Sequence, residues 1–453
     1  MAREKVFIPR LIFWETTKKC NLSCQHCRAI PEEELSKGEL TTEEAYDFFD
    51  QVAEFSNPIM VLSGGEPLYR DDIFDLAAYG RKKGLRMSLA TNGTMIDEAM
   101  AKKIADIGFA RVSISFDGSN AKTHDTFRAI PGSFDQATRG MKLLTQNGVS
   151  TQINTTIAKH NYKELPDILN MALDLKVDAL HTFLLVPVGC GVDIAKDQMV
   201  SSEEYEKILH WFYDKSKDVD IDLKATCAPH YFRVRTERIL EEKKAGKKHA
   251  PFIPHGTKLK AGHVDKVTTF KDGTSAKGQG LSAMTKGCLA ATGICFVSNL
   301  GQVFPCGYLP VMAGDLRKTP FKEIWDSGPV FQDLRKPALL KGKCGVCEYV
   351  HICEGCRARA YGTTGDYLDE EPFCVYVPEG AERKDEVEKA HMEAETTVSG
   401  LVLEWDEEAK RAVSGIPSFV RGKAIRKIEE YARKQGVSSV DIDIVRQARN
   451  LSM

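Results

Sequence analysis

The segment KKCNLSCQHCRA, residues 18–29, places three cysteines, Cys20, Cys24 and Cys27, within eight residues. It directly follows the apolar run LIFWETT, residues 11–17, which is typical of a buried strand. Three thiolates can hold three irons of a [4Fe-4S] cluster and leave the fourth iron open, whereas a closed electron-transfer cluster usually has four cysteines. A structural zinc site is the alternative, but zinc sites usually show four ligands in paired spacing. The segment therefore favours an open iron–sulfur cluster.

Outward from this segment, strand-like runs alternate with helix-like runs as far as about residue 224. Six further candidate strands are PIMVLSG, LRMSLATNG, ARVSISFDG, VSTQINTTI, ALHTFLLVPV and VDIDLKA. Between LIFWETT and PIMVLSG, Thr41 and Glu44 fit a capping box at the start of a helix. This alternation predicts an α/β fold with a parallel sheet, and seven units without an eighth indicate a partial (β/α)6-type TIM barrel. Functional residues are then expected at the C-terminal strand ends.

The composition sets limits on the classes of function. The 453 residues, 42% hydrophobic and 28% charged with a formal net charge of -2, indicate a globular protein of two to three domains with no overall attraction to nucleic acid. No signal peptide or membrane span is visible, so we expect a cytoplasmic protein. Thirteen cysteines in two clusters of such a chain favour metal ligation over disulfides.

Polar and glycine residues follow the predicted strands one after another. Gly64, Gly65 and Glu66 come after PIMVLS, where glycine lets a backbone approach a ligand and a carboxylate can accept hydrogen bonds from an ammonium group. The later strands carry Asn92, Ser115, Asn154 and Thr155 at or near their ends. Each alone would usually be a turn or a polar strand end. Their serial placement predicts one shared pocket.

The Cys-x3-Cys-x2-Cys spacing together with the Gly-Gly-Glu motif resembles the radical S-adenosylmethionine superfamily. The resemblance implies that the amino and carboxylate groups of S-adenosylmethionine chelate the open iron, and that a 5'-deoxyadenosyl radical then abstracts hydrogen from a substrate. It also implies a set of cofactor-binding residues: His26, Gly64, Gly65, Glu66, Asn92, Ser115, Arg128, Asn154 and Thr155. Of these, His26 would pack on adenine.

The second cysteine cluster resembles the auxiliary iron–sulfur domain called SPASM. Residues 286–378 show few elements able to form a core without metal. The resemblance implies at least one auxiliary [4Fe-4S] cluster, with ligands drawn from Cys344, Cys347, Cys353, Cys374, Cys288, Cys306 and Cys356, and with Cys295 as a further candidate. Only two residues separate Cys353 from Cys356, where the pattern has three, so the number of clusters stays open. Zinc is again the alternative, and Cys190 and Cys227 are expected to be buried thiols.

Several segments, among them KATCAPHYFRVR and GKCGVCEYVHICEGCRARAYGTTGDYLDEEPFC, resemble the heme-forming branch of the superfamily. This branch oxidatively decarboxylates two propionates of iron coproporphyrin III to vinyl groups, giving heme b. Such a tetracarboxylate substrate needs cationic partners. Arg233, Arg235, Arg357 and Arg359 are candidates, together with lysines between 243 and 277, and His230 could approach the heme iron.

Three rival functions stay open. One is a related tetrapyrrole enzyme, a 12,18-didecarboxysiroheme deacetylase or an enzyme of heme d1 biosynthesis. Another is a SPASM peptide maturase, although such enzymes often carry an N-terminal peptide-recognition domain and only nineteen residues precede Cys20, which argues against one here. The third is an iron–sulfur carrier, which would not need the strand-end constellation. An electron donor such as flavodoxin or ferredoxin is an expected partner.

The chain therefore divides into four predicted regions. These are a radical S-adenosylmethionine barrel at 8–225, a linker or basic loop at 226–285, an auxiliary iron–sulfur domain at 286–380, and a small helical domain at 395–453. The last region resembles the C-terminal domain of protochlorophyllide reductase subunits. Its run RGKAIRKIEEYARKQG predicts a helix ending at Gly436. We favour a solvated linker for the lysine-rich region over a basic lid.

Overall fold

The computed structural model describes residues 7–219, 221–246, 267–269, 275–277, 287–380, 383–390, 404–414, 428, 431–432 and 439–450. The chain forms two compact units. The first comprises residues 1–238, 255–258 and 265–388, and the second comprises 239–254, 259–264 and 389–453. The site described below lies in the first unit.

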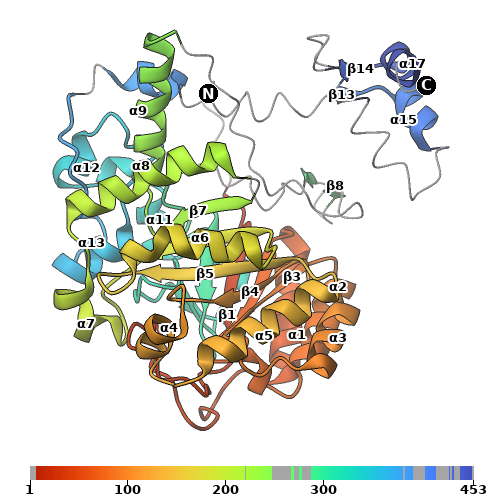
Figure 1. Ribbon diagram of the computed structural model, residues 1–453, viewed down its shortest axis with the longest axis vertical. Helices are drawn as coiled ribbons and strands as arrows, with labels where there is room; N and C mark the ends of the chain where they lie inside the picture. Colours follow the sequence, from red (N-terminus) through yellow and green to blue (C-terminus); the bar gives the residue numbers. More distant parts are fainter. Residues whose placement is uncertain are drawn as a thin grey trace. The chain divides into compact units, whose positions relative to one another are not determined.

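A single ten-stranded sheet organises the first unit (Figure 1). All seven strands expected from the sequence are present: β1 Leu11–Glu15, β2 Ile59–Ser63, β3 Arg86–Thr91, β4 Val112–Ser115, β5 Thr151–Ile157, β6 Ala179–Leu184 and β7 Asp222–Thr226. They pair in sequence order, each parallel to the next. The predicted parallel fold is confirmed, and the C-terminal ends of these strands meet at one edge of the sheet.

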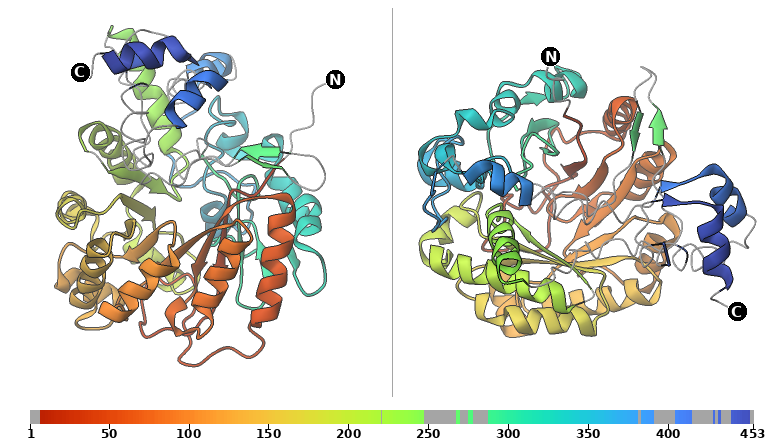
Figure 2. Two further views of the ribbon diagram at one scale, coloured as in Figure 1. Left: turned by 90° about the vertical axis from the view of Figure 1, so that its right-hand side faces the viewer. Right: turned by 90° about the horizontal axis from the view of Figure 1, so that it is seen from above.

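Helices follow the strands, and several of them pack on the outer face of the sheet, as Figure 2 shows in its right-hand view. They are α1 Thr42–Phe55, α2 Ile73–Lys82, α3 Glu98–Ile107, α4 Ala121–Arg128, α5 Ser133–Gln146, α6 Leu165–Asp174, α7 Gly191–Gln198, α8 Ser202–Asp218 and α9 Tyr231–Lys244. The predicted capping box starts α1, since Thr41 Oγ1 accepts from Glu44 N and Glu44 Oε2 accepts from Thr41 N. Helix α9 lies in the interval predicted as a linker, and the sequence analysis did not anticipate it. Most of residues 247–285 lie outside the described residues.

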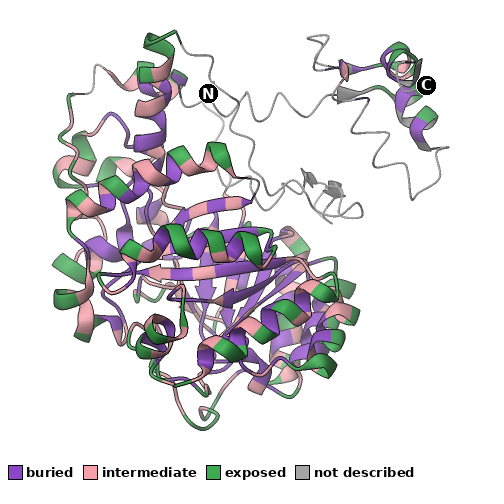
Figure 3. Cartoon of the chain, in the orientation of Figure 1, coloured by how far each residue is buried: buried purple, intermediate pink, exposed green. Residues whose placement is uncertain are grey.

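Alternation along each strand separates an apolar face from a more polar one. Trp14 is fully buried and its ring packs edge-on against Phe48 and Phe49 of α1, so its face of β1 is the helix-covered face. On β5, Ile153 and Ile157 are buried while Asn154 and Thr156 are partly accessible. Figure 3 shows the buried residues concentrated along the strands and the exposed residues on the outer sides of the helices. The concave face opposite the helices is therefore the polar one.

The cysteine-rich region adds three strands to the same sheet. β10 Ile294–Val297 pairs in parallel with β1, and β11 Gln302–Phe304 and β12 Gly314–Asp315 follow in antiparallel order. Helices α10 Phe321–Ser327, α11 Pro329–Leu334, α12 Gly342–Val346 and α13 Arg357–Thr364 complete the region. Phe321 and Trp325 are fully buried, and Phe321 packs against Phe48 of α1. These side chains extend the apolar core around α1 into the cysteine-rich region.

The second unit contains a small apolar core. Strands β13 Glu404–Trp405 and β14 Ser439–Val440 pair in parallel, and α15 Glu407–Ser414 and α17 Ile442–Asn450 pack together with them. The core includes Ala409, Val413, Ile428, Ala432 and Ile444. Most of the helix predicted at residues 421–436 lies outside the described residues, although Ile428, Tyr431 and Ala432 are helical. A hairpin of β8 Val267–Thr269 and β9 Ser275–Lys277 belongs to the first unit. No helix in the described part of the chain has the length and apolar character needed to cross a membrane.

Candidate active site and auxiliary cysteine groups

The loop after β1 carries Cys20, Cys24 and Cys27, and the backbone of the Gly-Gly-Glu motif holds it in place. Gly65 N donates to Thr17 O at 2.7 Å, and Glu66 N donates to Lys19 O at 2.8 Å. A Cβ on Gly65 would overlap the carbonyl oxygens of Lys18 and Lys19, so only glycine allows this approach. The motif therefore positions the cysteine loop against the end of β2, a role that the sequence analysis did not assign to it.

The carboxylate of Glu66 is fully buried and joins two strand ends. Its oxygens accept hydrogen bonds from Leu68 N at 3.1 Å, Thr91 Oγ1 at 2.8 Å and Asn92 N at 2.7 Å. Burial raises the pKa of Glu66 to about 7. Three internal donors occupy this carboxylate, so the main-chain carbonyls of the motif are the better acceptors for the ammonium group of a cofactor.

Asn92, at the end of β3, reaches the cysteine loop directly. Its Nδ2 lies 3.9 Å from Cys20 Sγ and donates to Asn21 Oδ1 at 2.8 Å. Its Oδ1 accepts from both the backbone and the hydroxyl of Thr94. The predicted strand-end asparagine thus lies beside the first cysteine.

A buried carboxylate, Asp117, connects two other predicted residues. Its Oδ2 lies 2.7 Å from Arg128 Nη2 and 3.3 Å from His26 Nε2, while Oδ1 accepts from Thr156 N at 2.7 Å. Arg128 Nη1 lies 3.5 Å from Cys24 Sγ. The arginine therefore bridges a fixed negative charge and the second cysteine of the loop. The sequence signal for Asp117 was its place in the strand-end run SISFDG, but no role was predicted for it.

His26 is held by stacking as well as by Asp117. Its ring lies parallel to that of Phe127, with ring centroids 4.3 Å apart. Burial lowers the pKa of His26 to about 4, so the imidazole is neutral at physiological pH. The predicted packing of His26 on adenine would use the face of the ring that Phe127 leaves open.

Strand register sorts the remaining predicted residues. Ser115 and Asn154 are partners across β4 and β5, so they lie side by side on the concave face. Thr155, the next residue, is fully buried on the opposite, helix-covered face. This corrects the prediction for Thr155, because successive side chains of a strand point to opposite faces and its hydroxyl points away from the pocket.

The cysteine loop fits an iron–sulfur cluster by the chemistry of its donors. Burial raises the pKa of Cys20 to about 11 and that of Cys27 to about 12, and it also raises the pKa of Cys24. Thiols in such surroundings become thiolate ligands when a metal centre supplies compensating positive charge. Within the described residues no three His, Cys, Asp or Glu side chains gather around one point as for a single ion. A cubane spaces its thiolates farther apart because each binds a different iron.

The cysteine-rich region contains two separate groups of thiols. Cys344, Cys347, Cys353 and Cys374 line one pocket, as predicted for one four-thiolate site. Backbone N–H groups point at two of these sulfurs, since Gly355 N lies 3.4 Å from Cys353 Sγ and Glu371 N lies 3.3 Å from Cys344 Sγ. We call these four residues the distal cysteine group.

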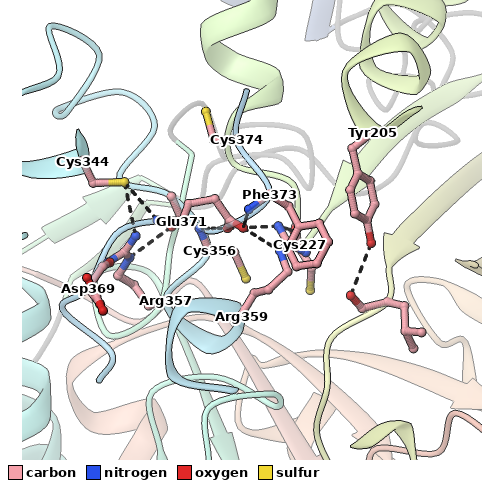
Figure 4. A network of polar contacts seen from close by, with 12 residues as sticks. Tyr205, Cys227, Cys344, Cys356, Arg357, Arg359, Asp369, Glu371, Phe373 and Cys374 are labelled. Atoms are coloured by element: carbon pink, nitrogen blue, oxygen red, sulfur yellow. Dashed lines mark hydrogen bonds and ion pairs between the residues drawn. The ribbon is translucent and has the colours of Figure 1, made fainter. Parts of the chain in front are cut away.

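The second group contains Cys288, Cys306 and Cys356, which are close enough to raise one another's pKa values. Cys227 joins them, although the sequence analysis treated it as an ordinary buried thiol. Figure 4 shows Cys227 and Cys356 close to the buried pair of Glu371 and Arg359. We call these four residues the proximal cysteine group.

Cys295 does not belong to either group, which corrects the prediction that it is a ligand. It pairs in register with Ile12 on β10 and is fully buried. Burial raises its pKa, and the charged group that acts on it is Arg335 rather than another thiol. The physical reason is again strand alternation, because Ile12 and Cys295 point to the apolar face of the sheet.

The predicted substrate cations are already paired within the protein. Arg233 is 3% exposed and makes ion pairs with Glu206 at 2.6 Å and Glu237 at 2.7 Å. Arg235 is equally buried, Arg359 pairs with Glu371 at 2.7 Å, and Arg357 donates to the carbonyls of Tyr367 and Asp369. The prediction that these arginines bind substrate is therefore not supported by the geometry. Lysines 243 and 244 end α9, and the lysines from 247 to 271 lie outside the described residues.

His230 also differs from its prediction. It is 1% exposed, lines the pocket of the distal cysteine group, and has no hydrogen-bond partner for either ring nitrogen among the described residues. Burial lowers its pKa to about 3. A buried place beside four thiols makes it a neighbour of that group rather than an axial ligand of a heme substrate.

Comparisons with known proteins define the class of this fold and site. The family model of the radical SAM superfamily matches residues 14–172, and that of the SPASM iron–sulfur cluster-binding domain matches residues 288–357. A third model, the proto-chlorophyllide reductase 57 kD subunit, matches residues 405–449. The structure of SuiB from Streptococcus suis bound to S-adenosylmethionine covers 82% of this chain and 78% of its own, with a TM-score of 0.59 and 14% identity, and supports the fold.

The chain belongs to the radical SAM superfamily. It is 48% identical over 370 residues to an AdoMet-dependent heme synthase of Methanosarcina barkeri, covering 82% of this chain and 97% of the relative. An Fe-coproporphyrin III synthase of the same organism is 30% identical, and the match covers 82% of this chain and 88% of that relative. The protein is thus an enzyme of the heme synthase type, acting in heme biosynthesis with S-adenosylmethionine and [4Fe-4S] clusters as cofactors.

Proposed function

We propose that this enzyme converts iron coproporphyrin III to heme b by oxidative decarboxylation of two propionates to vinyl groups. The observation that carries the proposal is the 48% identity to the heme synthase over 82% of this chain, against 30% to the Fe-coproporphyrin III synthase. A pre-heme d1 synthase of Dinoroseobacter shibae is also 30% identical. The sister enzymes therefore share the fold but are more distant in sequence.

The residues around the cysteine loop have distinct tasks in this proposal. Cys20, Cys24 and Cys27 would bind three irons of a cluster, and S-adenosylmethionine bound at the fourth supplies a 5'-deoxyadenosyl radical for hydrogen abstraction. The carbonyls of Gly64 and Gly65 would accept hydrogen bonds from the methionine ammonium. Ser115 and Asn154, which are register partners on the concave face, would offer hydroxyl and amide groups to the cofactor. Asp117 neutralises Arg128, which lies against Cys24.

A cationic cluster inside the barrel is our candidate for binding a substrate carboxylate. Arg111 Nη1 and His181 Nε2 lie 3.6 Å and 3.7 Å from the same oxygen of Asp222. Lys224 is the register partner of His181 on the concave face, and its amine makes no ion pair with any described residue. Burial lowers the pKa values of His181 and Lys224. The guanidinium of Arg111 and the amine of Lys224 therefore share the single carboxylate of Asp222 as a nearby negative charge, and a bound propionate would supply a second one.

The atoms and electrons of each proposed turnover can be accounted for. Removal of one hydrogen atom from the propionate carbon next to the ring, followed by loss of carbon dioxide, gives one vinyl group and leaves one electron to be removed. An auxiliary iron–sulfur cluster is the proposed acceptor of that electron. Two turnovers give the two vinyl groups of heme b. We propose flavodoxin or ferredoxin as the low-potential electron donor and the cytoplasm as the location.

The test is anaerobic incubation of the reconstituted enzyme with S-adenosylmethionine, a reductant and iron coproporphyrin III, followed by mass spectrometry of the porphyrin. Loss of two carbon dioxide units is the expected result. Parallel reactions with 12,18-didecarboxysiroheme and with the precursor of heme d1 separate the sister enzymes. An unchanged iron coproporphyrin III, with conversion of one of the other two substrates, would overturn the assignment. No tetrapyrrole conversion at all would favour a peptide maturase.

The carboxylate site has its own test. Replacing Lys224 by methionine removes the charge at similar length, and loss of one charge-assisted hydrogen bond should weaken porphyrin binding by about 1.5–3 kcal/mol. Binding is followed by the absorbance of the porphyrin. Lys224→Arg should retain most of the affinity, and the matched surface variant Lys207→Met should bind normally, since Lys207 is exposed. Equal affinity in the Lys224→Met protein and the parent would exclude this site.

A further inference from the structure

His230 is a buried polar side chain that the proposed reaction does not use. It directly precedes α9, and Val234 N donates to its carbonyl oxygen at 3.1 Å, so the first turn of the helix fixes its place. The side chain is 1% exposed, and neither ring nitrogen has a hydrogen-bond partner among the described residues. Buried donors in folded proteins almost always have a partner. The imidazole therefore points to an acceptor that a ligand of its pocket supplies.

The pocket that His230 lines is that of the distal cysteine group. Glu371 is the carboxylate whose charge acts most strongly on His230. Its two oxygens already accept hydrogen bonds from Arg359 and from the backbone N–H groups of Cys356 and Phe373, as Figure 4 shows in part. The four thiols, and the sulfides of a cluster bound by them, are then the acceptors that share the pocket with the imidazole N–H.

Arg233 lies one turn further along and adds a second donor to the same pocket. Its Nη groups bind Glu206 and Glu237, but its Nε has no hydrogen-bond partner among the described residues. Burial raises the pKa of Cys374, and the charge of Arg233 opposes this rise, so the guanidinium lies near that thiol. Residues three apart on a helix share one face. The start of α9 thus presents two unpartnered donors to the distal cysteine group.

Other positive charges and N–H groups surround the same four thiols. Arg357 Nη2 lies 3.7 Å from Cys344 Sγ, and Lys343 Nζ donates to the carbonyl of Cys374. The two backbone N–H groups described above also point at sulfurs of this group. Hydrogen bonds to the sulfurs of an iron–sulfur cluster, together with its charge and burial, set its reduction potential. Donors of this kind stabilise the more negative, reduced form.

We propose that His230 donates an N–H···S hydrogen bond to the [4Fe-4S] cluster of the distal cysteine group and so raises its reduction potential, with Arg233 Nε as a second donor. An imidazole carries at least one N–H in either of its ionisation states, so the contact needs no change of protonation. Four thiolates complete the coordination of a cubane. His230 is therefore a positioning residue that acts through the cluster, and this role holds whatever the porphyrin substrate is.

The first test detects the hydrogen bond in the full-length chain with ¹⁵N-labelled histidine. Replacing Cys20, Cys24 and Cys27 by alanine removes the barrel cluster, and the EPR signal that a further Cys347→Ala removes is that of the distal cluster. Pulsed EPR of this signal should show a weak nitrogen coupling, of the size that a hydrogen-bonded nitrogen gives, and His230→Leu should abolish it. The absence of any histidine coupling before this substitution would overturn the proposal. A coupling of the size of an iron-bound nitrogen would also overturn it, because His230 would then be a ligand.

The second test follows the same signal in a redox titration. His230→Leu should shift the midpoint potential to a lower value, whereas His230→Gln keeps an N–H group and should stay closer to the parent. The matched control His351→Leu replaces an exposed histidine of the same region and should leave the potential unchanged. An unchanged potential in the His230→Leu protein, with its distal cluster still bound, would contradict the proposal. If the leucine variant does not bind the cluster, His230→Gln replaces it in the labelling test, since glutamine carries no label.

Discussion

Gly65 shows how the absence of a side chain positions chemistry. Its N–H donates to Thr17 O, and the backbone of residues 18–19 passes so close that no Cβ fits. Gly65→Ala must therefore displace the cysteine loop, at a cost of about 1–3 kcal/mol for overpacking. We expect lower iron loading at this loop and at least a tenfold decrease in 5'-deoxyadenosine formation. The matched variant Gly293→Ala, whose Cβ would meet its nearest neighbour at an ordinary 3.5 Å, should behave as the parent.

Asp117 carries the charge balance beside the cysteine loop. Asp117→Asn keeps the shape but leaves Arg128 as a buried cation without its partner, which typically costs about 3–5 kcal/mol of stability. Urea unfolding of the reconstituted protein measures this loss. The exposed variant Asp167→Asn should stay within about 0.5 kcal/mol of the parent. A similar unfolding midpoint for both variants would show that Asp117 has no such role.

At the scale of residues, the sequence identified what lies close together along the chain. The three loop cysteines, Asn92 and the Ser115–Asn154 pair follow from local spacing and strand ends. Cys227, Thr155 and Cys295 did not follow, because their surroundings depend on which face of a strand they occupy and on contacts with distant segments. The arginines were misjudged for a similar reason, since the carboxylates that neutralise Arg233 come partly from another helix.

At the scale of elements, local signals were sufficient for the barrel. Seven apolar runs with turn residues at their ends predicted seven parallel strands, and the capping box predicted the start of α1. Strands β10 to β12 were not predicted, because they are short and β10 gains its stability by pairing with β1, almost 300 residues earlier. Helix α9 was hidden by the lysine-rich composition around its C-terminal end.

The capping box of α1 gives a prediction at this scale. Thr41→Ala removes the acceptor for Glu44 N and should lower the free energy of unfolding by about 1 kcal/mol. Thr41→Ser retains the hydroxyl, so its free energy of unfolding should stay within a few tenths of a kcal/mol of the parent's. Glu44 also pairs with Arg317 of the cysteine-rich region, so a larger loss in the alanine variant would indicate that the cap supports this long-range pair as well. Urea unfolding of the two variants and the parent decides between these outcomes.

At the scale of the whole molecule, the barrel and the cysteine-rich region share one sheet. A chain that ends at residue 246 would expose the edge of β1, whose sequence LIFWE normally pairs with β10. Unpaired apolar edges promote association. We expect this truncated chain to form aggregates in size-exclusion chromatography. A chain ending at residue 390 should, like the full chain, elute without aggregates. A well-behaved truncated barrel would show that β10 is dispensable for the sheet.

The central proposal is that a radical formed at the Cys20, Cys24 and Cys27 loop abstracts hydrogen from a propionate on the concave side of the barrel. The most direct test uses iron coproporphyrin III with deuterium on the propionate carbons next to the ring. Analysis of the 5'-deoxyadenosine by mass spectrometry should find deuterium in it, with two labelled molecules formed for each heme b. Unlabelled 5'-deoxyadenosine accompanying heme b formation would contradict the claim.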